Sequence, residues 1–233
     1  MQNRRGLFAG MQSGRLSGFV PYKGTKDLPN AGRISRFIRN FVDMKVALCQ
    51  FSMEWEAAAR NLRRAEELVA QAGADLALLP EMFATGFVTE PWRTALPDEE
   101  ELLAWMRRTA RRYATALAGS AVVRSGDRFA NRFFFVRPAG GAERYDKRHL
   151  FSIGGEDAHF VAGRRRVVVE YGGLRFLPLV CYDLRFPVWC RCRSDYDAIL
   201  CVASWPAPRR EVWRTLLRAR AIENQCYVVG VNR

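Results

Sequence analysis

Apolar residues along the chain fall into short dense runs, typical of buried strands, which are separated by longer stretches with helical spacing. The first run, KVALCQFS, covers residues 45–52 and predicts a strand. The run DLALLPE predicts a second strand, which ends at Glu81. Between them, residues 54–74 predict an amphipathic helix whose apolar face holds Trp55, Ala58, Leu62, Ala65 and Val69.

The same alternation continues beyond Glu81. Two further helices are predicted, over residues 98–117 and 210–224. The remaining apolar runs predict two strand pairs, joined at the turns SGD and GG, and two single strands, over residues 118–138, 165–181, 197–206 and 226–233. Strands that alternate with helices, together with hairpins, predict an α/β fold with a mixed sheet.

Length and composition place the chain among globular proteins. Its 233 residues fit one domain with a large core, and 49% of them are hydrophobic. No apolar run approaches the roughly 20 residues that a membrane-spanning helix needs, and the N-terminal stretch lacks the apolar segment of a secretory signal. We therefore expect a soluble, cytoplasmic protein that does not bind membranes.

The formal net charge of +13 is unevenly distributed. Residues 1–43 carry eight basic and two acidic side chains, and we expect them to form an extension outside the fold, with the domain over residues 44–233. Within that extension, the stretch GRISRFIRNFVD has apolar residues at helical spacing with arginines between them. A membrane-surface or targeting helix is therefore an alternative interpretation of this stretch. The other basic runs are scattered, and Arg outnumbers Lys 33 to 4, so we expect no nucleic-acid partner.

Three of the six cysteines lie in the stretch LPLVCYDLRFPVWCRC, residues 177–192. The spacing of Cys190 and Cys192 is a poor match to zinc-binding pairs, and the chain has only two histidines, so we expect no metal. A reducing cytoplasm disfavours disulfides. The remaining three are expected to act as small hydrophobic residues inside apolar strands: Cys49, Cys201 and Cys226.

Cys181 differs because it stands where a predicted strand gives way to a polar turn. Such a junction can expose the sulfur beside a free backbone N–H, as in a nucleophile elbow, although a core cysteine is the alternative. A thiol nucleophile needs a proton acceptor and a positive partner. Glu81, directly after an apolar run, is the candidate proton acceptor, although it could instead be a helix cap or a surface carboxylate. Lys147 is the candidate positive partner, although a lysine could also occur there by chance.

Three motifs resemble those of the carbon–nitrogen hydrolase (nitrilase) superfamily. LLPEMFATGF resembles its Glu motif, YDKRHLF its Lys motif and LVCYDLRFP its Cys motif, in the same order along the chain. The resemblance covers residues 44–233, and the stretches 61–87 and 213–233 are most similar to the omega-amidase branch. It implies a four-layer α-β-β-α sandwich, no metal or organic cofactor and a homo-oligomer. Relative to that family, we expect the chain to lack C-terminal strands.

The resemblance also implies roles for individual residues. Cys181 matches the nucleophile, Glu81 the general base, Lys147 the oxyanion-stabilising residue and Glu156 a second glutamate that positions the lysine. The implied reaction is hydrolysis of the terminal amide of a small carboxylated amide, such as 2-oxoglutaramate, through a cysteine thioester. The alternatives are an N-carbamoyl amino acid hydrolase, a nitrilase or an inactive, truncated remnant of the fold.

Substrate recognition can be inferred only in outline. The backbone N–H of Tyr182 would share the oxyanion with Lys147. A carboxylated substrate favours a guanidinium in the pocket, and Arg185 is the candidate, unless it pairs with Asp183 to brace the turn. We expect three aromatic side chains to form apolar walls of the substrate pocket: Phe83, Phe87 and Trp205. For each of them, an ordinary core position is the alternative.

Overall fold

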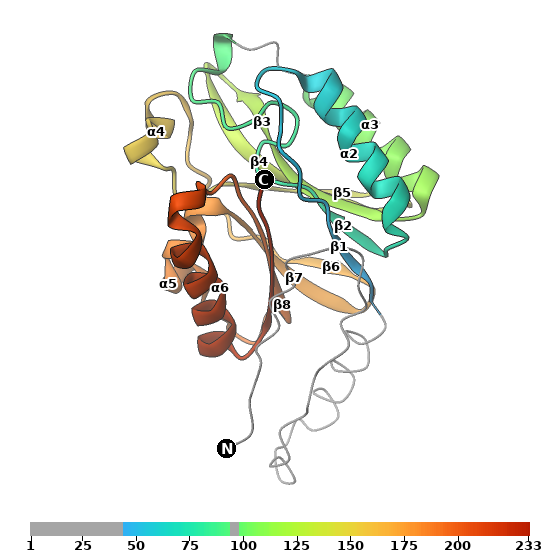
Figure 1. The fold of residues 1–233 in the computed structure, drawn as a ribbon. Helices are drawn as coiled ribbons and strands as arrows, with labels where there is room; N and C mark the ends of the chain where they lie inside the picture. The colour runs from blue at the N-terminus through green and yellow to red at the C-terminus, as the bar shows by residue number, and fades with distance from the viewer. Residues whose placement is uncertain (1–43, 94–97) are drawn as a thin grey trace.

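Two β-sheets lie face to face between two layers of helices (Figure 1). The computed structural model describes residues 44–93 and 98–233. The predicted N-terminal extension, residues 1–43, lies outside these ranges. None of the helices among the described residues is long and apolar enough to cross a membrane.

Each sheet is mixed. The first has the order β1-β2-β3-β4-β5, with β1, β2 and β3 parallel and the rest antiparallel. Its strands are Val46–Leu48, Leu76–Leu78, Ala116–Ser125, Arg128–Val136 and Ala142–Asp146. The second has the order β6-β7-β8-β9, with only β6 antiparallel to its neighbour. Its strands are Val169–Tyr171, Leu174–Val180, Ala198–Val202 and Tyr227–Val231.

Helices cover the outer face of each sheet. Helices α2 (Ala58–Ala72) and α3 (Glu99–Tyr113) pack on the first sheet, and α5 (Pro187–Cys190) and α6 (Arg210–Asn224) on the second (Figure 1). The short helix α4 (Glu156–His159) lies in the connection from β5 to β6. Four 3-10 turns complete the structure: η1 (Pro91–Arg93), η2 (Ser152–Gly154), η3 (Cys181–Arg185) and η4 (Ala207–Arg209).

The central strands are apolar on both faces because each face meets another layer. In β2, Leu76 and Leu78 face the core between the sheets, whereas Ala77 faces the helices α2 and α3. In β8, Leu200 faces the other sheet and Cys201 faces the core beneath α6. Successive side chains of a strand point to opposite faces, so doubly covered strands have continuous apolar runs. The four-layer sandwich implied by the resemblance is confirmed.

One prediction from the sequence needs correction, and one strand was missed. The helix predicted over residues 98–117 ends at Tyr113, because Ala114 takes the left-handed conformation, with φ of 51°, and the chain continues into β3. Strand β5 was not predicted. It contains Glu143, a residue type that is depleted in strands, and it pairs with β4 alone at the edge of the sheet.

The segment after β2 is held against β3 by backbone contacts. Leu79 N donates to Ala118 O at 2.7 Å, and Phe83 N donates to Ser120 O at 3.0 Å. Between these two bonds lies Glu81. The close approach requires Gly119, since a Cβ there would lie 2.9 Å from both Leu79 Cβ and a ring carbon of Phe83.

The substitution Gly119→Ala is therefore expected to lower the free energy of unfolding by about 1–3 kcal/mol, the usual cost of overpacking a core. Chemical denaturation in urea measures the change. Gly141→Ala is the matched control, because its Cβ would come no closer than 3.4 Å to the Arg137 side chain. Equal effects of the two substitutions would argue against a tight contact at Gly119.

Candidate active site

Four buried or half-buried groups meet where both sheets end. Glu81 follows β2, Lys147 follows β5, Cys181 follows β7, and Glu156 begins α4. Glu81 N also donates to Ala203 O, just after β8, at 3.4 Å, which joins the loops of the two sheets. Residues up to 100 positions apart in the sequence thus form one cluster. The sequence predicted each of these four residues as part of a single site.

Lys147 lies between two carboxylates. Its Nζ is 2.8 Å from Glu81 Oε1 and 2.8 Å from Glu156 Oε2, and all three side chains are fully buried. Burial alone lowers the pKa of the Lys147 ammonium, but the negative charges of Glu81 and Glu156 outweigh it and raise that pKa. Lys147 therefore stays charged at neutral pH. Glu81 and Glu156 are neither surface carboxylates nor helix caps exposed to water.

Further N–H groups complete the contacts of the carboxylates. Asn131 Nδ2 donates to Glu81 Oε1 at 2.9 Å and to Glu156 Oε1 at 3.0 Å. Ser204 N donates to Glu81 Oε2 at 2.8 Å, and Phe151 N donates to Glu156 Oε2 at 2.7 Å. Buried charges are tolerated when they are paired and hydrogen-bonded in this way.

Cys181 opens the turn η3 in an unusual backbone conformation. Its φ is 48°, in the left-handed region that residues other than glycine seldom adopt, and such strain is concentrated at functional sites. Burial raises the pKa of its thiol well above the usual value, the charge of Glu81 raises it further, and Lys147 opposes both. The thiol is therefore protonated at neutral pH, with a hydrogen bond to the Glu81 side chain.

Asp183 ties the lysine segment to the cysteine turn. Its fully buried carboxylate accepts from Tyr145 Oη at 2.8 Å and from Val180 N at 3.1 Å. It also accepts from His149 N at 2.9 Å and lies 2.9 Å from His149 Nδ1. Tyr145 and His149 flank Lys147, and Asp183 is two residues after Cys181. One carboxylate thus fixes the spacing of the two segments.

Arg185 lies elsewhere than beside Asp183. Its guanidinium carbon is 5.3 Å from the centre of the Trp205 ring and 6.0 Å from that of Tyr182. Arg185 is exposed, and no carboxylate among the described residues forms an ion pair with it. The alternative interpretation, in which Arg185 braces the turn through Asp183, is therefore wrong.

The three aromatic residues that were predicted to form walls of the pocket lie in different surroundings. Phe83 lies in the core between the first sheet and its helices, 5.9 Å from the Trp105 ring, which fits the alternative of an ordinary core residue. Phe87 is half-buried, and its ring centre lies 5.8 Å from Lys147 Nζ. Trp205 is buried beside the second sheet, beneath Arg185. Only Phe87 and Trp205 therefore contact residues of the site.

The other cysteines are structural. Cys190 is buried, and burial raises its pKa to about 12; Cys192 donates to Tyr196 O at 3.4 Å. Cys49 and Cys201 lie in the cores, and Cys226 packs against one. All six cysteines are free thiols.

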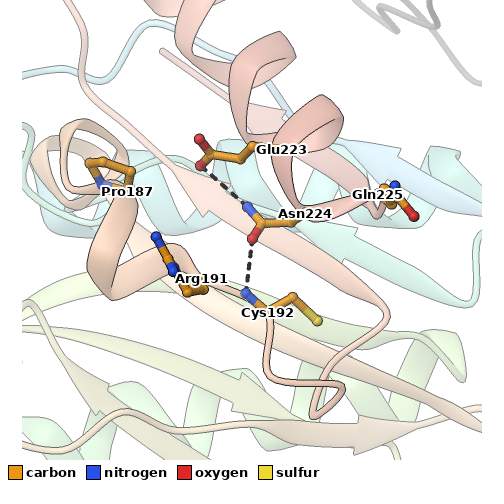
Figure 2. Close-up of a pocket in the computed structure, with 6 residues that line it drawn as sticks. All are labelled: Pro187, Arg191, Cys192, Glu223, Asn224 and Gln225. Carbon is orange, nitrogen blue, oxygen red and sulfur yellow. Dashed lines mark hydrogen bonds between the residues drawn. The ribbon is translucent and has the colours of Figure 1, made fainter.

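A separate hollow of about 290 Å³ lies on the outer side of the second sheet (Figure 2). It is lined by residues of α5, the loop after it and the C-terminal end of α6: Pro187, Arg191, Cys192, Glu223, Asn224 and Gln225. Asn224 Oδ1 accepts from Cys192 N at 2.8 Å across it. None of the four clustered residues lines this hollow, so it is distinct from the site.

The fold and the site belong to a known class of enzyme. The family model described as carbon-nitrogen hydrolase matches residues 45–233, and the chain belongs to that family. Curated relatives include the omega-amidase YafV of Yersinia enterocolitica, 49% identical over 82% of this chain and 74% of the relative. The 2-oxoglutaramate amidase of Bacillus subtilis (strain 168) is 32% identical over 80% of this chain and 75% of the relative. The chain is a cysteine-dependent amide hydrolase.

Solved structures support the same assignment. XC1258 from Xanthomonas campestris, a CN-hydrolase superfamily protein with an arsenic adduct in its active site, is 42% identical. It matches with a TM-score of 0.78 over 82% of this chain and 76% of that one. An amidase of the nitrilase superfamily from Nesterenkonia AN1 is 27% identical, with a TM-score of 0.74 over 81% of this chain and 76% of that one.

Sequence reasoning missed two contributors to the site. Asn131 lies inside the apolar strand β4, where its polarity in a buried run was the available signal. Asp183 was considered only as a partner of Arg185.

The substitution Asp183→Ala is expected to lower the free energy of unfolding by about 3 kcal/mol or more, because several buried donors lose a charged acceptor. Urea denaturation measures it. The control Glu67→Ala removes the exposed ion pair with Arg64 and should change stability by no more than about 0.5 kcal/mol. A similarly small effect of Asp183→Ala would show that the network does not stabilise the fold.

Proposed function

We propose that the protein hydrolyses the terminal amide of a small carboxylated amide, with 2-oxoglutaramate as the representative substrate. The observation that carries the proposal is the convergence of Cys181, Glu81, Lys147 and Glu156 at one buried point. Relatives named omega-amidase and 2-oxoglutaramate amidase support the substrate class. In a mutant of the Nesterenkonia amidase, acrylamide adds to the active-site cysteine, which supports a thiol nucleophile.

In the first half-reaction, Glu81 takes the proton of the Cys181 thiol as the sulfur attacks the amide carbon. A carbon–sulfur bond forms, and the electron pair of the carbonyl moves to oxygen. This coupled transfer is required because the thiol does not ionise alone at neutral pH. When the intermediate collapses, the carbon–nitrogen bond breaks and Glu81 returns the proton to nitrogen, so ammonia leaves.

In the second half-reaction, Glu81 takes a proton from water, whose oxygen attacks the thioester carbon. Collapse breaks the carbon–sulfur bond, the product carboxylic acid leaves, and Cys181 regains its proton from Glu81. The same carboxyl thus acts four times, twice as base and twice as acid. Glu156 does not exchange protons in this scheme; it holds Lys147 in place and charged.

Two donors support the oxyanion of both intermediates. Lys147 donates to two carboxylates, which leaves the third of its three N–H bonds for the developing charge. Tyr182 is the second residue of η3, so its backbone N–H has no acceptor within that turn. Preorganised donors of this kind contribute about 3 kcal/mol each to transition-state stabilisation.

The substitution Cys181→Ala is expected to abolish ammonia release from 2-oxoglutaramate, because no other group can form the thioester. A coupled assay for ammonia measures it. Cys192→Ala is the matched control and should retain the wild-type rate, since its half-buried thiol lies outside the site. Undiminished activity of Cys181→Ala would refute the mechanism.

Recognition of the substrate carboxylate is assigned to Arg185, with Arg209 as a second cation. Both guanidinium groups lie over aromatic rings that border the cysteine turn: Arg185 over Trp205 and Arg209 over Phe151. Phe151 and Tyr182 are themselves in contact, with ring centres 5.2 Å apart. Such stacking orients a guanidinium while leaving its N–H edge free for a carboxylate.

The substitution Arg185→Gln is expected to raise KM for 2-oxoglutaramate about tenfold or more, since a charged hydrogen bond is worth roughly 1.5–3 kcal/mol. KM for pentanamide, a neutral amide of similar length, should not change. The control Arg63→Gln, exposed on α2, should leave both values unaltered. An equal rise of KM for both substrates would rule out carboxylate recognition by Arg185.

We also infer a homo-oligomer. Val188 on α5 is 74% exposed and Ile222 on α6 is 76% exposed, and each adjoins a residue that lines the hollow in Figure 2. Exposed apolar side chains of this size are candidates for a subunit contact. Light scattering of the purified chain would test this inference. The cytoplasmic location expected from the sequence stays a prediction.

A further inference from the structure

Asn131 contacts both carboxylates of the site through a single nitrogen. Its Nδ2 lies 2.9 Å from Glu81 Oε1 and 3.0 Å from Glu156 Oε1, so each N–H of the amide serves one carboxylate. Its backbone oxygen accepts from Lys147 N at 2.9 Å. Asn131 therefore touches three of the four clustered residues, and it lies fully buried in the middle of β4.

This contact comes at a cost in hydrogen bonding. The orientation of the amide is fixed, because turning it over would place Oδ1 against two carboxylates. As it stands, Oδ1 is buried without a partner, one of two such side-chain atoms in the described part of the chain. The other is Ser204 Oγ, whose residue also donates to Glu81. An unpaired buried acceptor costs about 1–3 kcal/mol, which offsets part of what the two N–H bonds of this asparagine contribute.

The amide also offsets a local excess of negative charge. The titratable groups that face this point are Glu81 from the β2 loop, Glu156 from α4, Lys147 from the end of β5 and Cys181 from η3. With the thiol protonated, two carboxylates share one ammonium. The two N–H bonds of Asn131 place the positive end of the amide dipole against both carboxylates, one N–H on each.

Asn131 further determines which oxygen of Glu81 can accept the thiol proton. A carboxylate oxygen has two lone pairs. Oε1 already accepts two N–H bonds, from Lys147 and Asn131, whereas Oε2 accepts one, from the backbone of Ser204. One lone pair of Oε2 therefore remains, and proton transfer from sulfur is directed to that atom.

We propose that Asn131 is a positioning residue for the amidase reaction: it holds the carboxylates of Glu81 and Glu156 in place and directs proton transfer to Glu81 Oε2. The inference rests on the function proposed above for Cys181 and Glu81. It predicts that loss of the amide donor impairs the chemical step without weakening substrate binding.

The test compares Asn131→Leu with Asn61→Leu. Asn61 is a matched control because it is also a buried amide, which links the backbones of Glu54 and Ala84 away from the site. Asn131→Leu should lower kcat for 2-oxoglutaramate roughly 100-fold, the scale expected when a reacting group is misplaced, with KM within about twofold. Asn61→Leu should leave kcat and KM unchanged even if it lowers Tm.

Alkylation of Cys181 by iodoacetamide gives a readout that does not depend on turnover. Its rate at a fixed pH should fall in Asn131→Leu, because Glu81 Oε2 is no longer held where it can accept the thiol proton. Should that variant not fold, Asn131→Asp keeps the shape of the side chain and replaces the donor with an acceptor, so kcat and the alkylation rate should both fall. A wild-type kcat and alkylation rate in either variant would overturn the inference. Failure of the proposed function would be recognised separately, because ammonia release would then persist in Cys181→Ala.

Discussion

The burial of Lys147 between Glu81 and Glu156 is the constraint on which the rest of the site depends. Removing three charges from water is costly, and the cost is tolerated only with full pairing and hydrogen bonding. Each carboxylate therefore needs donors besides the lysine, and these come from Asn131, from Ser204 and from Phe151. The lysine remains charged as a result, and a cation stands ready beside the thiol.

A second requirement is that the cysteine turn keeps its position relative to this cluster. Asp183 meets it by binding residues on either side of Lys147 while it also accepts from Val180 N, at the end of β7. Arg220 on α6 adds a further restraint, because its Nε donates to Leu184 O in the same turn at 2.9 Å. The strained φ of Cys181 can persist because its surroundings fix the chain on several sides.

Much of this arrangement could be predicted from the sequence, and the limits have physical causes. Most strands and α6 were predicted because apolar periodicity reflects burial directly. The predicted helix over residues 98–117 ran too far since backbone conformation at Ala114, rather than hydrophobicity, ends α3. The motifs identified Glu81, Lys147, Cys181 and Glu156. The contacts of Asn131 and of Asp183 could not be predicted, because they depend on side chains that meet only across folded strands.

The stacking of the two sheets has a consequence for how activity and folding are related. Glu81, Asn131 and Lys147 come from the first sheet, whereas Cys181 and Ser204 come from the second. Neither sheet alone holds both a nucleophile and a base. A partly melted state that kept its secondary structure but lost the register between the sheets would be inert. Turnover therefore reports on the docking of the two halves, much as a split enzyme reports on the association of its fragments.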